Sequence, residues 1–357
     1  MTDPGVQPTA ERTPGPGPGP DPLLPLDIVT RFLDENGLGT GPVMAERIGD
    51  GQSNLTYALR RGDETVVLRR GPRPPLPRST HDMVREAQVQ RFVGERGVPV
   101  PRILAVCPDE TLLGVPFYVM EHLDGLVITD DIPEQLSAPE ERRRTSEQLV
   151  DLLATLHDVP VDNEDAAGLG RPDGYLERQV SRFSRLWPTV SERELPLVGE
   201  LATRLSARIP VPQRASLIHG DYRLGNLMFE RSSPARVRAL LDWEMSTLGD
   251  PLADVGYLMA MYADADAPAS IMQLTPVTRE PGYLTRRELA ERYAAASGAD
   301  LGELGWYEAL ALWKAAVFCE AIHTRWRHGE RPGDDFGPRL TEGVPELLRA
   351  AEAALDR

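Results

Sequence analysis

The chain has 357 residues, of which 41% are hydrophobic and 26% are charged, and its formal net charge is −16. This length suits two lobes or domains better than one core, and the composition is that of a globular protein. The negative charge argues against nucleic acid or an anionic membrane as the main partner, and no apolar run approaches the ~20 residues of a membrane span.

The sequence contains two cysteines, Cys107 and Cys319, which lie far apart. They provide neither a disulfide framework nor a CxxC metal motif, so a reducing compartment is the simpler interpretation. The N-terminus lacks the basic start and the apolar core of a signal peptide. We therefore expect a cytoplasmic protein.

Residues 1–25 contain eight prolines and four glycines. Such a segment buries almost no apolar surface, which predicts a disordered Pro/Gly-rich tail. Apolar residues then recur at helical spacing from Leu26 until Asn36-Gly37 ends the predicted helix.

The following segment has the pattern of a small antiparallel sheet. Apolar and polar residues alternate on both sides of Gly49 and Gly51, and TVVLRR at 65–70 forms the next strand. Residues 80–96 have the apolar spacing of an amphipathic helix. Two further predicted strands, at 98–106 and 115–120, complete the sheet.

From residue 126 onward the apolar spacing is mainly helical. Predicted helices include one that ends at His157 and others at 174–187, 192–208, 285–297 and 304–328. Thr285-Arg286-Arg287-Glu288 has the sequence of a capping box at the start of the fourth of these helices.

The stretch between residues 216 and 258 holds most of the functional information. A short apolar strand at 216–218 ends at His219-Gly220-Asp221, and Asn226 follows five residues after Asp221. A second strand at 237–241, which we expect to be the hairpin partner of the first, ends at Asp242. Three oxygen-bearing side chains are thus predicted to converge from two loops.

These three side chains match the requirements of phosphoryl transfer from a nucleotide. The reaction needs a carboxylate that orients and deprotonates the acceptor hydroxyl, and hard oxygen ligands for Mg²⁺. Asp221 is the expected catalytic base, and Asn226 and Asp242 are the expected metal ligands, in the order and spacing of a kinase catalytic loop. The motif reads H-G-D rather than H-R-D, and D-W-E stands where protein kinases have D-F-G.

The longer motifs HGDYRLGNLMF and LLDWEMSTLGDPLADVGYL resemble the aminoglycoside phosphotransferase and choline kinase-like superfamily. They look most like the branch related to the kinase-like domain fused to some acyl-CoA dehydrogenases. The resemblance implies an α+β, bilobal protein-kinase-like fold with a small antiparallel β-sheet in one lobe and mostly helices in the other. Its expected parts are an N-terminal nucleotide-binding lobe (26–121), a hinge (122–125) and a C-terminal catalytic and acceptor-binding lobe (126–357).

The resemblance also assigns nucleotide-binding residues. Arg69 stands where kinases have the lysine that pairs with phosphates, and Glu86 would be the helix glutamate that holds this cation. A guanidinium is a planar fork rather than a point charge, but it still binds phosphate. Glu121 begins the hinge, whose backbone holds the adenine edge. The loop expected over the phosphates has the pattern G-x-G-x-x-N and contains Gly49, Gly51 and Ser53.

Four residues are assigned around the catalytic loop. We expect His219 to hold the loop by hydrogen bonds and Asp254 to anchor it from the start of a helix. Arg223 and Glu244 flank the two functional loops, where each is a candidate either for contact with phosphate, metal or acceptor or for a structural salt link.

A basic cluster at the end of the long C-terminal helix is the candidate acceptor site. Arg325 and Arg327 flank Trp326 in an otherwise acidic chain, an arrangement that suits a phosphate or carboxylate beside an aromatic ring. A helix C-terminus also favours cations through its macrodipole, so part of the cluster has a purely structural interpretation.

The sequence therefore predicts a small-molecule kinase that uses ATP or GTP with Mg²⁺ and phosphorylates a hydroxyl group. Two classes of acceptor stay open: an anionic metabolite such as a hydroxyacyl-CoA, and an aminoglycoside or amino alcohol. A non-catalytic pseudokinase is a further alternative, which Arg69 and the third loop position, Asn54, favour. No activation segment of the protein-kinase type follows Asp242.

Overall fold

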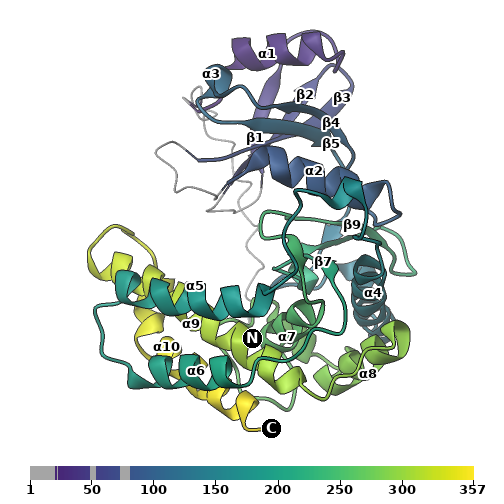
Figure 1. Cartoon of the computed structure of the whole chain (residues 1–357). Coiled ribbons are helices and arrows are strands. Elements are labelled where there is room, and N and C mark those ends of the chain that lie inside the picture. Colours follow the sequence, from purple (N-terminus) through teal and green to yellow (C-terminus); the bar gives the residue numbers. More distant parts are fainter. Residues whose placement is uncertain (1–20, 22, 49–53, 73–80) are drawn as a thin grey trace, which may run out of the picture.

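The structure is a computed structural model that describes residues 21, 23–48, 54–72 and 81–357. These residues form two lobes joined by a short connection, with a sheet-containing N-terminal lobe above a larger helical C-terminal lobe (Figure 1). The predicted α+β bilobal kinase-like fold is therefore confirmed. Most of the predicted N-terminal tail and the loop residues Gly49, Gly51 and Ser53 lie outside the described residues.

A five-stranded antiparallel sheet with the order β1-β2-β3-β5-β4 is the centre of the N-terminal lobe. Its strands are β1 (Met44–Ile48), β2 (Leu55–Arg61), β3 (Glu64–Arg70), β4 (Ile103–Cys107) and β5 (Phe117–Glu121). Three helices accompany it: α1 (Leu26–Glu35), α2 (Met83–Gly94) and α3 (Glu110–Leu113).

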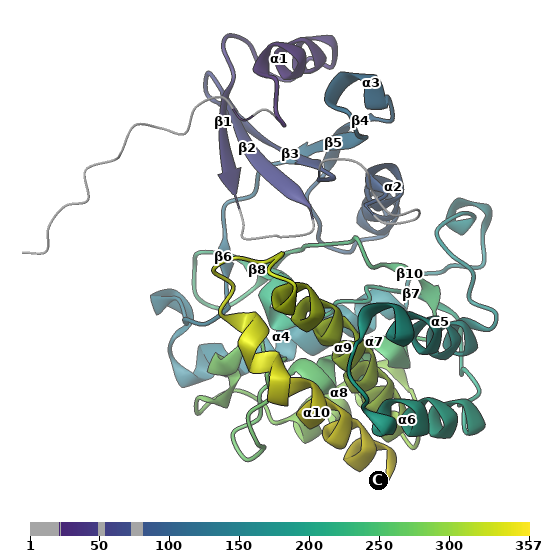
Figure 2. The same cartoon turned by 90° about the vertical axis from the view of Figure 1, so that its left-hand side faces the viewer.

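The two faces of this sheet pack against different helices (Figure 2). Leu68 packs with the apolar side chains of α1 on one face, whereas Tyr118 packs with Met83 and Ala87 of α2 on the other. Because side chains alternate along a strand, Arg69 shares the α2 face with Tyr118, its partner in β5. The strand register thus directs Arg69 toward α2.

The C-terminal lobe is a group of helices packed around α9. The longer helices are α4 (Pro139–His157), α5 (Tyr175–Val190), α6 (Pro196–Ala207), α7 (Leu252–Met261), α8 (Arg286–Ser297), α9 (Leu304–Arg327) and α10 (Phe336–Leu355). Buried apolar side chains of these helices, among them Trp313, form one continuous core. The predicted capping box at Thr285 and Glu288 is confirmed, with both of its hydrogen bonds present.

Short strands lie between the helical core and the N-terminal lobe. One sheet pairs β7 (Ser216–Ile218) with β10 (Thr247–Gly249), and the other has the order β6-β8-β9, formed by Leu126–Val127, Leu227–Phe229 and Val237–Leu240. The expected hairpin of 216–218 with 237–241 is wrong. The physical reason is that Leu227–Phe229, directly after the catalytic loop, is itself an apolar strand that pairs with β9 and leaves β7 to β10.

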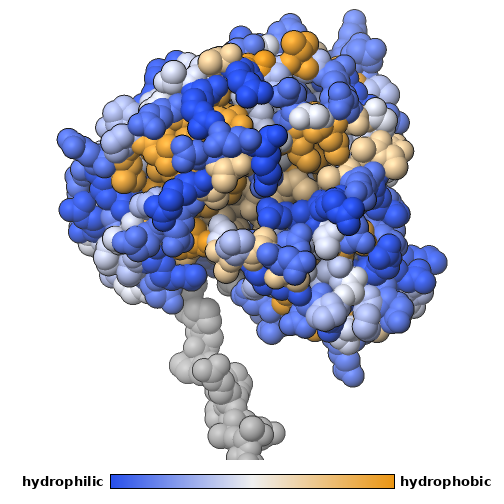
Figure 3. Space-filling model, turned by 90° about the horizontal axis from the view of Figure 1, so that it is seen from below, coloured by the Kyte–Doolittle hydropathy of each residue, from blue (hydrophilic) through white to orange (hydrophobic). Residues whose placement is uncertain are grey.

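The surface agrees with the composition. Figure 3 shows one face on which hydrophilic residues surround smaller apolar patches. None of the helices among the described residues is long and apolar enough to cross a membrane.

Candidate active site

The loop that follows β7 and carries Asp221 is held by a buried carboxylate on α7. Asp254 accepts hydrogen bonds from the backbone N–H groups of His219 (2.6 Å) and Gly220 (2.8 Å). Gly220 has a φ of 84°, and a Cβ there would lie 2.6 Å from the carbonyl oxygen of Met245, so only glycine fits. This anchor fixes the direction in which the chain delivers Asp221.

His157 at the end of α4 extends the same network. Its Nε2 lies 3.2 Å from Asp254, and its Nδ1 lies 2.8 Å from the hydroxyl of Tyr293. Burial alone would raise the pKa of Asp254, but the hydrogen bond from His157 and the nearby imidazole of His219 outweigh it and hold this pKa below its usual range. Asp254 therefore remains an anion that can accept all of these hydrogen bonds.

His219 connects the catalytic loop to the strand that carries Asp242. Its Nε2 lies 2.9 Å from the carbonyl oxygen of Leu241, and its Nδ1 lies 3.3 Å from the backbone nitrogen of Asp221. Both ring nitrogens are thus occupied by backbone groups. This geometry suits the expected loop-holding role better than proton transfer.

The carboxylate of Asp221 is oriented by two donors from different elements. Tyr257 on α7 donates its hydroxyl proton to Oδ1 at 2.5 Å, and Asn226 donates from Nδ2 to Oδ2 at 2.9 Å. The guanidinium of Arg223 lies 3.7 Å from Oδ2. Burial and the neighbouring carboxylate raise the pKa of Tyr257 far above its usual value, so its hydroxyl stays protonated and donates.

Asp242 follows β9 and has an uncommon backbone conformation. Its φ is 67°, in the left-handed region that few residues other than Gly, Asn and Asp adopt. Its Oδ1 accepts a hydrogen bond of 2.5 Å from Arg69 on β3. The two lobes thus meet at the carboxylate that the sequence assigned to the metal.

Arg69 is surrounded by carboxylates. The Nε of Arg69 lies 2.9 Å from Glu86 on α2, and its Nη2 lies 3.7 Å from Glu244. Glu86 also accepts a hydrogen bond from Tyr118. Burial would lower the pKa of Arg69, but Glu86 and the other nearby anions outweigh it and raise that pKa, so the guanidinium remains charged.

Asn54 and Glu244 form a second connection between the lobes. The amide of Asn54 donates to Glu244 at 2.6 Å, and its oxygen lies 2.7 Å from the Nδ1 of His81. Asn54 is buried, and it stands at the position where the loop pattern has lost its third glycine. The replacement of this glycine by Asn54 therefore supplies a side-chain contact with the loop that carries Asp242 and Glu244.

A cavity of about 290 Å³ opens beside Asp221 in the C-terminal lobe. Asp221, Glu244 and Asp254 are its acidic lining residues, and Lys314 on α9 is its basic one. The rest of the wall is mainly apolar or aromatic and includes Tyr175, Met245, Met272, Leu310 and Phe318. Such a wall suits an apolar ligand segment better than a polycation.

Three of the predicted residues make their contacts outside this network. The side chain of Glu121 bonds Arg102 on the surface at 2.8 Å, and its backbone N–H already donates to the carbonyl of Arg102. Arg325 contacts Glu330 at 3.1 Å, and Arg327 lies 3.9 Å from Glu192, both on exposed surface. Neither arginine is among the residues that line the cavity.

Two residues at the site were missed by the sequence reasoning. Tyr257 follows Asp254 by three positions on α7, so both lie on the face toward the catalytic loop, and this helical spacing could have identified it. Lys314 is the only lysine in the chain, and this rarity could have drawn attention to it as a residue of the cavity wall.

The donor set fits Mg²⁺, which prefers oxygen ligands and is commonly held by one or two carboxylates together with substrate phosphates. Both hydrogen bonds made by the amide of Asn226 use its nitrogen, which leaves its oxygen for a metal. Asp242 supplies the carboxylate. Among the described residues no cluster of three or more His, Cys, Asp or Glu side chains is arranged to hold a metal ion.

Comparison with known sequences shows what the chain is similar to. The mouse protein acyl-CoA dehydrogenase family member 10 is 31% identical over 332 residues, which are 91% of this chain and 31% of that protein. Acyl-CoA dehydrogenase family member 11 from Gallus gallus is 33% identical over 298 residues, which are 81% of this chain and 38% of that protein. The chain thus spans less than half the length of these relatives.

Comparison with solved structures supports the fold. A predicted aminoglycoside phosphotransferase from Ralstonia eutropha is 27% identical, with a TM-score of 0.74 and coverage of 92% of this chain and 98% of that one. The sequence model described as "Phosphotransferase enzyme family" matches residues 45–316. That range is well over half of the sequence, so the chain belongs to the phosphotransferase enzyme family.

Proposed function

We propose that the protein transfers the γ-phosphoryl group of ATP or GTP to a hydroxyl of an anionic small molecule, with a hydroxyacyl-CoA as the candidate acceptor. The observation that carries the proposal is the chain of hydrogen bonds that brings Asp221, Asn226 and Asp242 together with Arg69. Asn226 bonds Asp221, its backbone bonds Leu241 next to Asp242, and Arg69 bonds Asp242. Asp221 also lines the largely apolar cavity. Family membership supports the reaction class.

In this mechanism Asp221 accepts the proton of the acceptor hydroxyl. The hydroxyl oxygen forms a bond to the γ-phosphorus, and the bond between that phosphorus and the β,γ-bridging oxygen breaks. Tyr257 and Asn226 keep the carboxylate in place, so little reorganisation is needed at the moment of transfer. Arg69, held by Glu86, binds nucleotide phosphate.

Mg²⁺, held by Asn226 and Asp242, would neutralise charge on the phosphates. In the structure Asp242 is paired with Arg69. Nucleotide phosphate offers Arg69 another anionic partner and so releases Asp242 for its role as a ligand.

The cavity supports an acceptor with an apolar segment. An aminoglycoside or amino alcohol is cationic and needs carboxylates, whereas Asp254, one of the three acids in the cavity wall, already accepts hydrogen bonds from His219 and Gly220. The similarity to acyl-CoA dehydrogenase family members adds support for an acyl-CoA acceptor.

Turnover of ATP should be screened against hydroxyacyl-CoAs, hydroxy acids, amino alcohols and aminoglycosides. We expect the anionic hydroxy compounds to be phosphorylated, and Asp221→Asn to lower kcat by at least about 10²-fold, because general-base catalysis contributes this much. Nucleotide affinity measured by calorimetry should be unchanged, because the phosphate-binding residues remain. Retained turnover in Asp221→Asn would reject the base, and preferred phosphorylation of an aminoglycoside would reject the acceptor class.

A further inference from the structure

Lys314 is exceptional in this chain, whose other basic residues apart from histidine are all arginines. It lies on the face of α9 that forms one wall of the cavity, together with Leu310, Ala311 and Phe318. These positions recur at three- and four-residue intervals, so their side chains point the same way. The single lysine therefore shares a cavity with Asp221.

The ammonium group of Lys314 has no carboxylate at ion-pair distance within the described part of the chain. Its Nζ lies 5.1 Å from the ring centroid of Phe183 on α5, a cation–π contact. Burial and the nearby charge of Arg182 lower the pKa of Lys314 to about 8. The carboxylate of Asp254 acts in the opposite direction but does not outweigh these two effects. An anionic ligand beside the ammonium group would therefore favour its charged form.

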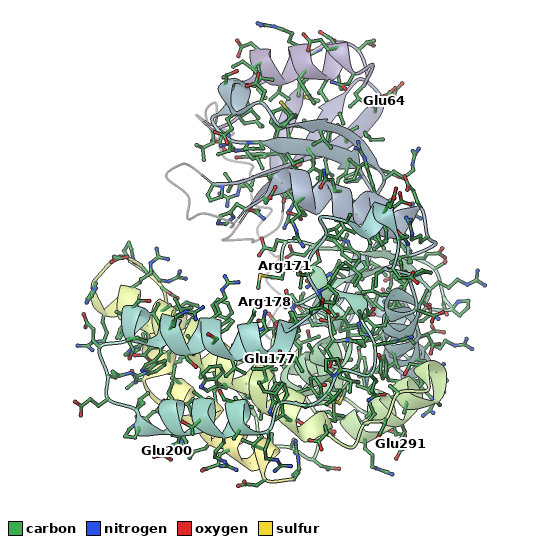
Figure 4. The ribbon with its side chains drawn as sticks, viewed as in Figure 1. Glu64, Arg171, Glu177, Arg178, Glu200 and Glu291 are labelled. Carbon is green, nitrogen blue, oxygen red and sulfur yellow. The ribbon has the colours of Figure 1, made fainter. Side chains whose placement is uncertain are left out.

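Arg182 belongs to a row of cations along α5. Arg178, Arg182 and Arg185 occur four and three positions apart and so share one helix face. Figure 4 shows Arg178, with Arg171 just before the helix, on the side of α5 that faces the N-terminal lobe. In a chain of net charge −16, this row concentrates three positive charges on one face of α5.

We propose that Lys314, supported by Arg182, binds the anionic group of an acceptor whose apolar segment fills the cavity and whose hydroxyl lies at Asp221. The ligand class is a hydroxy compound with an apolar chain and a carboxylate or phosphate. This inference rests on the proposed function for the identity of the cavity as the acceptor site. Lys314 is then the residue that selects anionic over neutral or cationic acceptors.

The test uses a matched pair of ligands, hydroxyoctanoate and octanediol, which share a chain and differ in the carboxylate. Reductive methylation with carbon-13 formaldehyde labels the single lysine and the α-amino group, so NMR can follow the titration of Lys314 in the whole protein. Hydroxyoctanoate should move the titration midpoint of Lys314 upward, because a nearby anion favours the charged form. Octanediol should not.

Calorimetry on variants completes the test. Lys314→Met should weaken hydroxyoctanoate binding by at least about tenfold, since a hydrogen bond to a charged group is lost. Octanediol affinity should stay the same, and Lys314→Arg should retain most of the affinity for the acid. The control is Arg287→Met, an exposed change on α8 where Arg287 pairs with Glu291. Figure 4 shows Glu291 well away from α5 and Arg178.

The outcomes separate this inference from the proposed function. An unmoved midpoint, absence of hydroxyoctanoate binding, or an equal loss of affinity for the acid and the diol overturns the anion site even if the protein phosphorylates other hydroxyls. A lysine that responds to hydroxyoctanoate as expected supports the anion site even if no compound is phosphorylated, because neither measurement uses nucleotide.

Discussion

Asp254 shows how much of the site depends on one side chain. It is fully buried, yet it accepts hydrogen bonds from the backbone of the catalytic loop and contacts His157 from α4. A buried carboxylate is tolerated only when its oxygens are satisfied in this way. The orientation of Asp221 is therefore determined by an acid that need not touch substrate.

Asp242 allows a sharp test at the residue scale, because its positive φ limits which variants are informative. Asn tolerates this conformation, whereas Ala would add backbone strain. We expect Asp242→Asn to weaken Mg²⁺-dependent nucleotide binding by at least about tenfold, because an anionic ligand is lost. Metal-free binding should stay equal or improve, since Arg69 loses a competing partner. Calorimetry with and without Mg²⁺ measures both, and an equal loss in the two titrations would identify a structural residue.

At the scale of elements, the close packing of α7 on α9 positions the site. Asp254 and Tyr257 lie on α7, and Lys314 lies on α9. Gly256 of α7 faces α9, where a Cβ on Gly256 would be 2.5 Å from the carbonyl carbon of Tyr307. The absence of a side chain at Gly256 lets the two helices approach closely enough to frame one cavity.

The glycine can be tested with a matched control. Gly256→Ala should destabilise the protein by about 1–3 kcal/mol through overpacking. Gly199→Ala in α6 is the same change at an exposed helix position with no atom within 4 Å of the new Cβ, and it should be neutral or stabilise by up to about 1 kcal/mol. Urea unfolding of both variants measures the difference. Equal free energies of unfolding would show that α7 and α9 are not tightly constrained at this point.

At the scale of the whole molecule, apolar packing and polar contacts both join the lobes. Val89, Phe92 and Val93 of α2 belong to the same hydrophobic core as the C-terminal helices. Arg69 reaches Asp242, and Asn54 reaches Glu244. Arg85 of α2 also donates to the carbonyl oxygens of Leu169 (2.5 Å) and Ser246 (2.6 Å). Two arginines of the N-terminal lobe, Arg69 and Arg85, thus add hydrogen bonds to this lobe interface.

Replacement of Arg85 should loosen this arrangement. Arg85→Met removes two hydrogen bonds from a charged donor, each of which contributes about 1.5–3 kcal/mol. We expect a larger radius of gyration by small-angle X-ray scattering and a lower nucleotide affinity, because the phosphate-binding and metal-binding residues lie on different lobes. Arg60→Met is the control, since Arg60 is exposed on β2 and pairs with Glu46. An unchanged radius and affinity in Arg85→Met would show that other contacts set the lobe position.

The sequence by itself determined the local parts of this protein. Strand and helix periodicity predicted the five strands of the N-terminal sheet and the larger helices up to α9, but not α10 or the short strands β6, β8 and β10. The spacing of Asp221 and Asn226 predicted one loop, because residues five apart after a buried strand have few ways to separate. The ion pair of Arg69 with Glu86, implied by family resemblance, is also present.

The tertiary structure decided which distant segments meet. It gave β7 the partner β10 instead of β9, brought Tyr257 to Asp221 across 36 positions, and placed Lys314 in the wall of the same cavity. Such contacts depend on how α7, α9 and the short strands pack, and many residues share the energy of that packing. Because no local pattern records the sum of those contacts, the anchor of the base and the lysine of the cavity became visible only in the folded chain.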